Sequence, residues 1–281
     1  MLPLIIFAVG IVFHNYQRDR QAATQRVLET ARNIRLLLDA EMQRMTGGLQ
    51  VLALTNSLRD GDFANFRRIA AGFLEQYGKD GVVLVADRTG HQAFSSLTPD
   101  TASLPPRNNL EIVEKVFATR QPQYSNLFFG AVKQRLIITV EVPVIRDGEV
   151  LYDISFSPPI GVFQAMIEKQ RLNQDWTISI FDSEGVNLAR VPNPQATIGQ
   201  RASPTLFAEM FRQSEATLPT VSLEGVALIT GFTRSRVTGW KAETSSTPRL
   251  LVGLGLDSGI WSSTISKAAS GPATSRPSSA A

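Results

Sequence analysis

The chain has 281 residues, 43% of them hydrophobic, which is typical of a globular protein with room for two domains. Its formal charge of +3 is small and its basic residues are scattered, so the sequence argues against a nucleic-acid partner. The absence of cysteine excludes disulfides, thiolate metal sites and cysteine nucleophiles.

The N-terminus is apolar over residues 2–13, interrupted only by Pro3 and Gly10. This run is shorter than the roughly 20 residues that cross a bilayer, and it lacks the basic start and cleavage site of a secretory signal. We interpret residues 1–16 as part of a transmembrane signal anchor that begins upstream of this sequence; the alternative is the start of a buried amphipathic helix. The arginines that follow would place their side in the cytoplasm by charge alone, but long translocated domains largely escape that rule.

A long helix is predicted from about residue 14 to residue 58, a segment without proline. Its apolar residues recur in steps of three and four, at Val27, Ala31, Ile34, Leu38, Met42, Met45, Leu49 and Leu52. Such a helix would be about 67 Å long, enough to run past two stacked modules or to pair with a second copy as a coiled coil. Gly47-Gly48 offers a point for bending. With a second helix over residues 63–77, it forms a stalk covering residues 17–80.

Two sequence blocks each occur twice. An apolar strand ending in Asp-x-x-Gly covers residues 82–90 and returns at residues 177–185, an offset of 95. A second block at residues 135–139, closed by Gly148, returns at residues 226–230, closed by Gly239, an offset of 91. The repetition predicts two copies of one small module, at residues 81–172 and 173–241.

Each module is predicted to be a five-stranded antiparallel sheet with helices, which gives an α+β fold. The first module has strands at 82–87, 91–96, 123–131, 134–145 and 149–157, with a helix at 109–119. A linking helix covers residues 160–172. The second module repeats this order with strands at 176–182, 186–191, 217–223 and 226–236 and a helix at 203–213, so its fifth strand is missing.

A candidate binding face follows from the hairpin at Asp147-Gly148, a strong signal for a two-residue turn. This turn pairs Thr139 with Phe156 and Pro143 with Tyr152. The expected apolar face, toward the long helix, carries Leu136, Ile138, Val140, Val142 and Val144, with Asp153 solvated near its end. The opposite face mixes aromatic and polar residues, as small-ligand pockets do. The predicted ligand-binding residues are Tyr124, Phe128, Arg135, Thr139, Glu141, Tyr152 and Phe156.

Arg135 could pair with a carboxylate bidentately, while Glu141 could receive an amine or simply neutralise Arg135. An ordinary solvated sheet face is an equally weighted interpretation of the same residues. Asp87 and Asp182 precede turns, where Asp caps the backbone, and His14 and His91 are isolated. We found no motif for catalysis, a metal or a cofactor, and we expect no enzymatic activity.

The ensemble of the long helix, the tandem modules, the strand-Asp-x-x-Gly openings and the hairpin at residues 143–148 resembles the double Cache domain. This is the extracytoplasmic, PAS-like sensor domain of bacterial histidine kinases, chemoreceptors and diguanylate cyclases. Residues 148–159 and 181–190 are most similar to sensor histidine kinases of alphaproteobacterial type. The resemblance covers about residues 14–241. The segment 124–129 lacks the Arg and Trp of the amino-acid-binding subset, so amino acids are not implied.

The C-terminal segment departs from that family. Residues 242–281 are rich in Ser, Thr, Ala, Gly and Pro and read as a low-complexity tail; the kinase domain expected of the family is missing.

Two hypotheses follow. The resemblance implies a membrane-bound sensor input domain in the bacterial inner membrane. It would face the periplasm, bind a small, anionic metabolite in the first module and form a homodimer through the long helix. The alternative is a truncated Cache protein that serves as a dimerisation or interaction module without a ligand.

Overall fold

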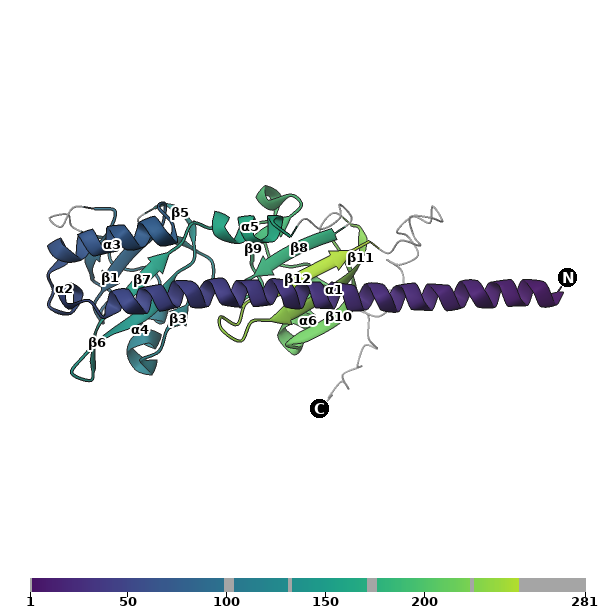
Figure 1. Cartoon of the computed structure of the whole chain (residues 1–281), viewed down its shortest axis with the longest axis horizontal. Coiled ribbons are helices and arrows are strands. Elements are labelled where there is room, and N and C mark those ends of the chain that lie inside the picture. Colours follow the sequence, from purple (N-terminus) through teal and green to yellow (C-terminus); the bar gives the residue numbers. More distant parts are fainter. Residues whose placement is uncertain (1, 99–103, 131–132, 171–175, 223–224, 248–281) are drawn as a thin grey trace, which may run out of the picture.

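The computed structural model describes residues 2–98, 104–130, 133–170, 176–222 and 225–247. The fold is α+β, with one long N-terminal helix and two antiparallel sheets of five strands each (Figure 1). The prediction of two similar modules beside a long helix is therefore confirmed.

Helix α1 (Leu2–Ala53) runs along both sheets, and its N-terminal part projects beyond the second one (Figure 1). The eight residues of the predicted apolar stripe are all buried, with exposures of 3% or less. The helix passes through Gly47 and Gly48 without interruption, and Gly48 lets the Tyr77 ring lie against its backbone. It begins earlier than predicted, at Leu2. It also ends earlier, because the chain turns at Thr55 into the separate short helix α2 (Asn56–Arg59). Among the described residues, no helix meets the length and hydropathy needed to cross a membrane.

The first module is built on a sheet with the order β2-β1-β7-β6-β3. Its strands are β1 (Val82–Ala86), β2 (Gln92–Ser95), β3 (Gln123–Tyr124), β6 (Val140–Arg146) and β7 (Glu149–Ser157). One face packs on α1 and on α3 (Phe63–Tyr77), and α4 (Leu110–Thr119) contacts the sheet through β3, β6 and β7.

A separate ribbon lies beside this sheet. The continuous strands predicted at 123–131 and 134–145 are wrong, because the chain leaves the sheet after Tyr124 and rejoins it at Val140. The segment between forms a two-stranded ribbon, β4 (Phe128–Gly130) with β5 (Arg135–Ile137). The ribbon becomes one wall of the candidate site described below.

The predicted hairpin register is also wrong over most of its length. Asp147-Gly148 does form the turn, and Arg146 faces Glu149. A bulge between Val144 and Ile145 then shifts the pairing by one residue, so that Val140 faces Phe156 and Glu141 faces Ser155. A shift of one residue exchanges the two faces of one strand relative to its partner, so side chains that were expected on the same face of the sheet lie on opposite faces.

The second module follows α5 (Gly161–Glu168), which ends earlier than the predicted helix at 160–172. Its sheet has the order β10-β11-β12-β8-β9. The elements are β8 (Trp176–Phe181), β9 (Asn187–Val191), the 3-10 turn η1 (Pro194–Ala196), α6 (Pro204–Arg212), β10 (Glu215–Val221), β11 (Ala227–Arg234) and β12 (Lys241–Ser246).

The prediction that the second module lacks its fifth strand is wrong. Strand β12 lies in the middle of the sheet, pairing with β11 on one side and β8 on the other. Its residues are all buried although most are polar, which is why composition alone suggested a tail. Residues 248–281 of the predicted tail lie outside the described residues.

The segment that leaves the first sheet docks on the second module. The Leu127 N–H donates to Asp182 Oδ2 (3.0 Å), and Asn126 Oδ1 accepts from the N–H (3.1 Å) and hydroxyl (2.6 Å) of Ser183. Asn126 also donates to Glu184 Oε1 (3.1 Å). We call these contacts the inter-module latch. It ties the residue before β4 to the Asp-x-x-Gly turn of the second module.

Candidate functional site

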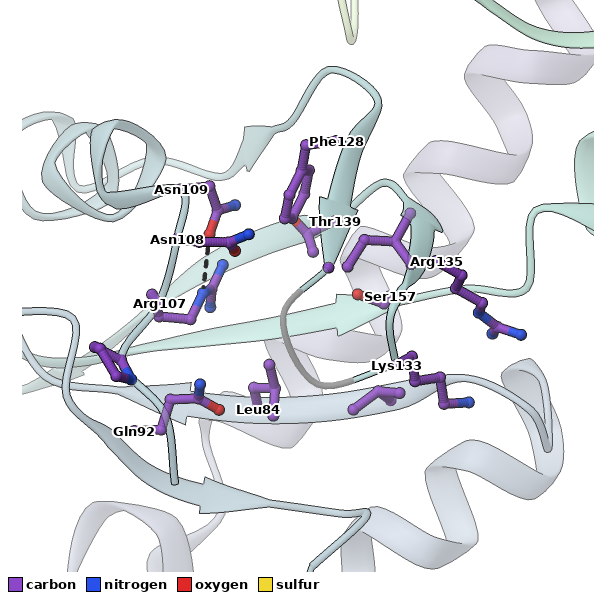
Figure 2. Close-up of a pocket in the computed structure, with 14 residues that line it drawn as sticks. Leu84, Gln92, Arg107, Asn108, Asn109, Phe128, Lys133, Arg135, Thr139 and Ser157 are labelled. Carbon is purple, nitrogen blue, oxygen red and sulfur yellow. Dashed lines mark hydrogen bonds between the residues drawn. The ribbon is translucent and has the colours of Figure 1, made fainter. Parts of the chain in front are cut away.

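A cavity of about 30 Å³ lies in the first module between β1, the β4–β5 ribbon and the residues that precede α4 (Figure 2). Its apolar lining consists of Val82, Leu84, Pro106, Phe128 and Ile137. Its polar lining includes Gln92, Arg107, Asn109, Thr139 and Ser157. Apolar walls with a few polar groups are the usual composition of small-molecule sites.

The buried guanidinium of Arg107 anchors the inner side of this cavity. Its side chain is 3% exposed and forms an ion pair with Glu141, which is fully buried. Its Nη1 donates to Ser155 Oγ (3.0 Å) and lies 3.7 Å from Asp153 Oδ2. The Arg107 Nε donates to Asn109 Oδ1 (3.1 Å), which connects the cluster to the start of α4. We call Arg107, Glu141, Asp153 and Ser155 the buried charge cluster.

The two carboxyl groups of the cluster have opposite pKa shifts. Burial raises the pKa of Asp153 well above its usual value, and the adjacent Glu141 charge raises it further. Burial also opposes ionisation of Glu141, but the Arg107 charge and hydrogen bonds from its neighbours outweigh it and lower the pKa of Glu141. One guanidinium therefore balances one carboxylate, and Asp153 is the carboxyl that keeps its proton. The cluster is electrically neutral in that state.

Two cations, Lys133 and Arg135, lie on the β5 side of the cavity. Their tips point away from its interior (Figure 2), and both donate to the carbonyl of Asp80, at 2.5 Å for Lys133 Nζ and 3.3 Å for Arg135 Nη2. Burial and the neighbouring Arg135 charge lower the pKa of Lys133. These groups can reach an anion at the mouth of the cavity, whereas Glu141 does not neutralise Arg135 as one prediction had it.

The structure separates the predicted site residues into two groups. Phe128, Arg135 and Thr139 line the cavity, and Glu141 lies directly behind Arg107. The other three, Tyr124, Tyr152 and Phe156, pack toward the helices on the opposite face of the sheet. The Tyr124 hydroxyl bonds to Thr46 on α1 (3.0 Å), while Tyr152 and Phe156 stack edge-on with Phe63 and Phe73. Placing Tyr152 and Phe156 on the Glu141 face was wrong, because the bulge reverses the faces of β7.

Asp153 shows the same effect in the opposite direction. It was expected on the apolar face and in solvent, but it faces Pro143 on the Glu141 side and is fully buried. Arg107 was not predicted at all. The available signal was an arginine directly after Pro105-Pro106 and before a predicted helix, but nothing in the sequence marked it as buried.

The repeated aspartates have the structural role that was predicted. Asp87 accepts from the N–H groups of Thr89 (2.8 Å) and His91 (3.1 Å), and Asp182 accepts from those of Glu184 (2.9 Å) and Val186 (2.8 Å). Across the described parts of the chain, no group of three or more His, Cys, Asp or Glu side chains is placed to hold a metal ion.

The fold is similar to that of solved sensor domains from bacterial histidine kinases and chemoreceptors. No protein-family model and no curated protein matches the sequence. Solved structures do match. The periplasmic sensory domain of the Campylobacter jejuni chemoreceptor Tlp1 matches with a TM-score of 0.63 and 10% identity, over 85% of this chain and 99% of that one.

Two further structures have the same arrangement. The ligand-binding domain of the Pseudomonas fluorescens chemoreceptor CtaA, in complex with L-isoleucine, has a TM-score of 0.61 and 12% identity over 86% of this chain and 99% of its own. The extracellular domain of the histidine kinase candidate rpHK1S-Z16 has a TM-score of 0.57 and 16% identity over 80% of this chain and 97% of its own. At these identities the likeness establishes a shared fold.

Proposed function

We propose that the chain is the ligand-sensing input domain of a membrane-bound bacterial receptor of the histidine kinase type, and that its ligand binds in the cavity of the first module. The observation that carries this proposal is the cavity itself, which combines apolar walls with two buried polar atoms, Gln92 Oε1 and Asn109 Nδ2, that have no hydrogen-bond partner among the described residues. The solved domains of CtaA with L-isoleucine and of Mlp24 with asparagine support small-molecule binding by this fold.

The ligand is proposed to be a small metabolite with an anionic group. Lys133 and Arg135 lie at the mouth of the cavity, and they currently share a backbone carbonyl instead of a carboxylate. A carboxylate at the mouth would accept hydrogen bonds from both cations and add the attraction between opposite charges, which their present bonds to a neutral carbonyl lack.

A structural change caused by the ligand is proposed to pass from the β4–β5 ribbon to the rest of the molecule by two routes. The inter-module latch joins the residue before β4 to the turn of the second module. The Tyr124 hydroxyl, at the end of β3, contacts Thr46 on α1. Displacement of the ribbon by a ligand would therefore move its contacts with both the second module and the long helix.

A homodimer through α1 is proposed on the basis of its outward face. Three apolar residues on this face, Leu36, Leu37 and Val51, are exposed by 39% to 68%, and Leu54, directly after the helix, is exposed by 68%. With Ala40 and Gly47 they recur at roughly heptad spacing, which is the pattern of a helix that pairs with another. In a single copy of the chain, this part of the helix surface is exposed to solvent.

The remaining elements of the proposal concern location and family. Residues 1–16 would anchor the chain in the inner membrane with the modules in the periplasm. The two modules would be the membrane-distal and membrane-proximal halves of a double Cache domain of alphaproteobacterial type, with the second half extended to Ser246 by β12. The stalk would cover residues 17–80.

The test is a metabolite screen by thermal unfolding of the full chain in detergent. A ligand that binds only the folded state raises the melting temperature by mass action. We expect a small carboxylate to do so, and Arg135→Ala to weaken its affinity at least fivefold, while Arg212→Ala on the second module leaves it unchanged. If no metabolite shifts the melting temperature, the alternative gains: the chain would then serve as an interaction or dimerisation module, using the exposed face of α1.

A further inference from the structure

The outward face of α1 changes character along the helix. Nearer the N-terminus its exposed residues include Arg26, Glu29 and Arg32. Between residues 33 and 54, nine residues are exposed, and Arg44 is the only one of them that is charged. The solvent-facing surface of a small soluble protein usually carries about 25–35% charged residues. The stretch 33–54 therefore has the composition of a surface that a partner covers.

The one exposed charge on this face is neutralised within its own chain. The Arg44 guanidinium donates to both carboxylate oxygens of Glu41, at 3.0 Å from Nε and 2.7 Å from Nη2. It also lies 4.6 Å from the centre of the Tyr77 ring, which belongs to α3. Both contacts hold the guanidinium on the first module, so a second helix can approach this face without burying an unpaired charge.

The exposed residues of this face recur every seven positions. Its central row, opposite the buried stripe, is Asn33, Ala40, Gly47 and Leu54. A repeat of seven is the pattern of helices that pair along their length. No described atom lies within 4 Å of the place that a Cβ at Gly47 would take, although glycine inside a helix costs about 1 kcal/mol relative to alanine. Ala40 and Gly47 leave room for the backbone of a second helix to approach closely.

The row also favours one direction of pairing. In a parallel, in-register pair each residue meets its own copy, so the Asn33 amides face each other, and an amide can donate to and accept from its equal. A polar residue in the central row is a known means of fixing the register of such pairs. In an antiparallel pair centred between Ala40 and Gly47, Asn33 would instead face the apolar Leu54.

We propose that two copies of the chain pair in parallel along residues 33–54, with Ala40 and Gly47 at the closest approach of the two helices. This inference deepens the homodimer of the proposed function and rests on it. It places the contact on the turn of α1 that also holds the first module. Thr46 Oγ1 lies 3.0 Å from the Tyr124 hydroxyl, so a displacement of Tyr124 would act beside Gly47.

The first experiment is disulfide cross-linking of the full chain in detergent, which starts without background because the chain has no cysteine. Ala40→Cys and Gly47→Cys should each form covalent dimers on mild oxidation, since a disulfide requires Cα atoms within about 7 Å of each other. Ala71→Cys and Gly72→Cys, at exposed neighbouring positions on α3, are the matched controls. We expect both α1 variants to cross-link on the order of tenfold faster than the controls.

A second variant tests the face without cysteines. Leu37→Glu places like charges beside each other in the parallel pair and should weaken association by on the order of tenfold in analytical ultracentrifugation. Ile69→Glu on α3 is the control, because Ile69 and Leu37 are similarly exposed, at 36% and 39%. It should leave association unchanged, and both variants should retain the melting temperature of the first module.

The outcomes separate this inference from the proposals on which it rests. A mixture of Ala40→Cys and Gly47→Cys chains that forms mainly mixed disulfides would show an antiparallel pair and overturn the parallel one. A chain that dimerises while neither α1 variant cross-links faster than its control, or while Leu37→Glu associates normally, would place the interface elsewhere and leave the homodimer standing. A chain that stays monomeric at all concentrations would refute both the homodimer and this interface, whereas ligand sensing is decided separately by the thermal screen.

Discussion

The two modules share one fold but differ in chemistry at the same place. Each has a residue in front of its helix whose N–H donates to the glycine of the Asp-x-x-Gly turn: Arg107 to Gly90 in the first module and Ala202 to Gly185 in the second, both at 3.0 Å. The residue that holds the buried charge cluster in one module is therefore an alanine in the other.

The strand pairings extend this comparison across the sheets. Leu84 faces Ser155, which faces Glu141; in the second module Ser179 faces Glu243, which faces Phe232. The Arg107–Glu141 ion pair thus corresponds to Ala202 and Phe232. These two belong to an apolar cluster with Phe181, Leu206 and Met210. The second module thus has apolar side chains at the two positions where the first has the Arg107–Glu141 ion pair.

The difference between the two modules can be judged by what a buried ion pair contributes to stability. A buried ion pair is often no more stabilising than apolar side chains of similar volume, so stability alone does not explain why the first module keeps one. The second module shows that the same fold can hold apolar side chains, Ala202 and Phe232, at these two positions. This difference agrees with the proposal that the first module binds a ligand and the second does not.

Removing the arginine of the charge cluster should have the largest effect. Arg107→Ala leaves Glu141 buried without a counter-charge and should lower the free energy of unfolding by about 3–5 kcal/mol. The double variant Arg107→Ala, Glu141→Phe copies the second module and should recover most of that loss. Urea unfolding of the three proteins measures both values. A loss below about 1 kcal/mol for Arg107→Ala would contradict the assignment of the cluster.

The second module has its own buried acid, at the position of Ser155. Burial raises the pKa of Glu243 to about 7. The folded chain then holds a proton that the unfolded chain releases near its ordinary pKa of 4.5, so this contribution to stability is complete below pH 4.5 and lost as the pH rises toward 7. Glu243→Gln should remove that loss, on the order of 3 kcal/mol in total. Unfolding curves for both proteins across this pH range provide the measurement, and parallel pH profiles would refute it.

Asp153→Asn sharpens the comparison for the first module. Because burial raises the pKa of Asp153, its stability contribution is complete below its unfolded pKa and lost as the pH rises through its folded pKa. Relative to the parent, the variant should gain up to about 1.4 kcal/mol for each pH unit within that window. Guanidinium unfolding at a series of pH values checks the slope. A variant that loses stability as the pH rises would show that Asp153 is ionised in the folded chain.

The latch should have the smallest effect on stability. Asn126→Ala removes hydrogen bonds to Ser183 and Glu184, and should lower the free energy of unfolding by about 1–2 kcal/mol. The exposed Asn65→Ala serves as a control. If the latch couples the modules, hydrogen exchange at amides of the Asp182 turn should also become faster in Asn126→Ala. Unchanged exchange there would mean that the contact is incidental.

Sequence patterns that repeat many times were the ones that predicted structure well. The stripe of α1 has eight members, so single ambiguities did not matter, and α3 and the hairpin turn have strong local signals. The bulge at Val144 depends on how the sheet packs and has no local signature, yet it decides the faces of Tyr152, Asp153 and Phe156. Strand β12 was missed because its polar residues are buried by its central place in the sheet.

The site was only partly predictable for the same reason. Phe128, Arg135 and Thr139 were predicted as site residues and line the cavity, although the strands that suggested them are divided differently, whereas Arg107 comes from a loop and meets Glu141 across 34 residues of sequence. A loop arginine such as Arg107 can be recognised as buried only once the fold shows that Glu141 and Asp153 lie beside it.

The central claim is that the first module binds the ligand and the second does not. The most direct test is an NMR titration of the full chain in detergent micelles with the metabolite that most raises its melting temperature. The account predicts the largest amide shift changes in β1, β2, β4 and β5 and at the residues preceding α4, with smaller changes at the Asp182 turn through the latch. Largest changes around α6 and β12, with the first module unperturbed, would contradict it.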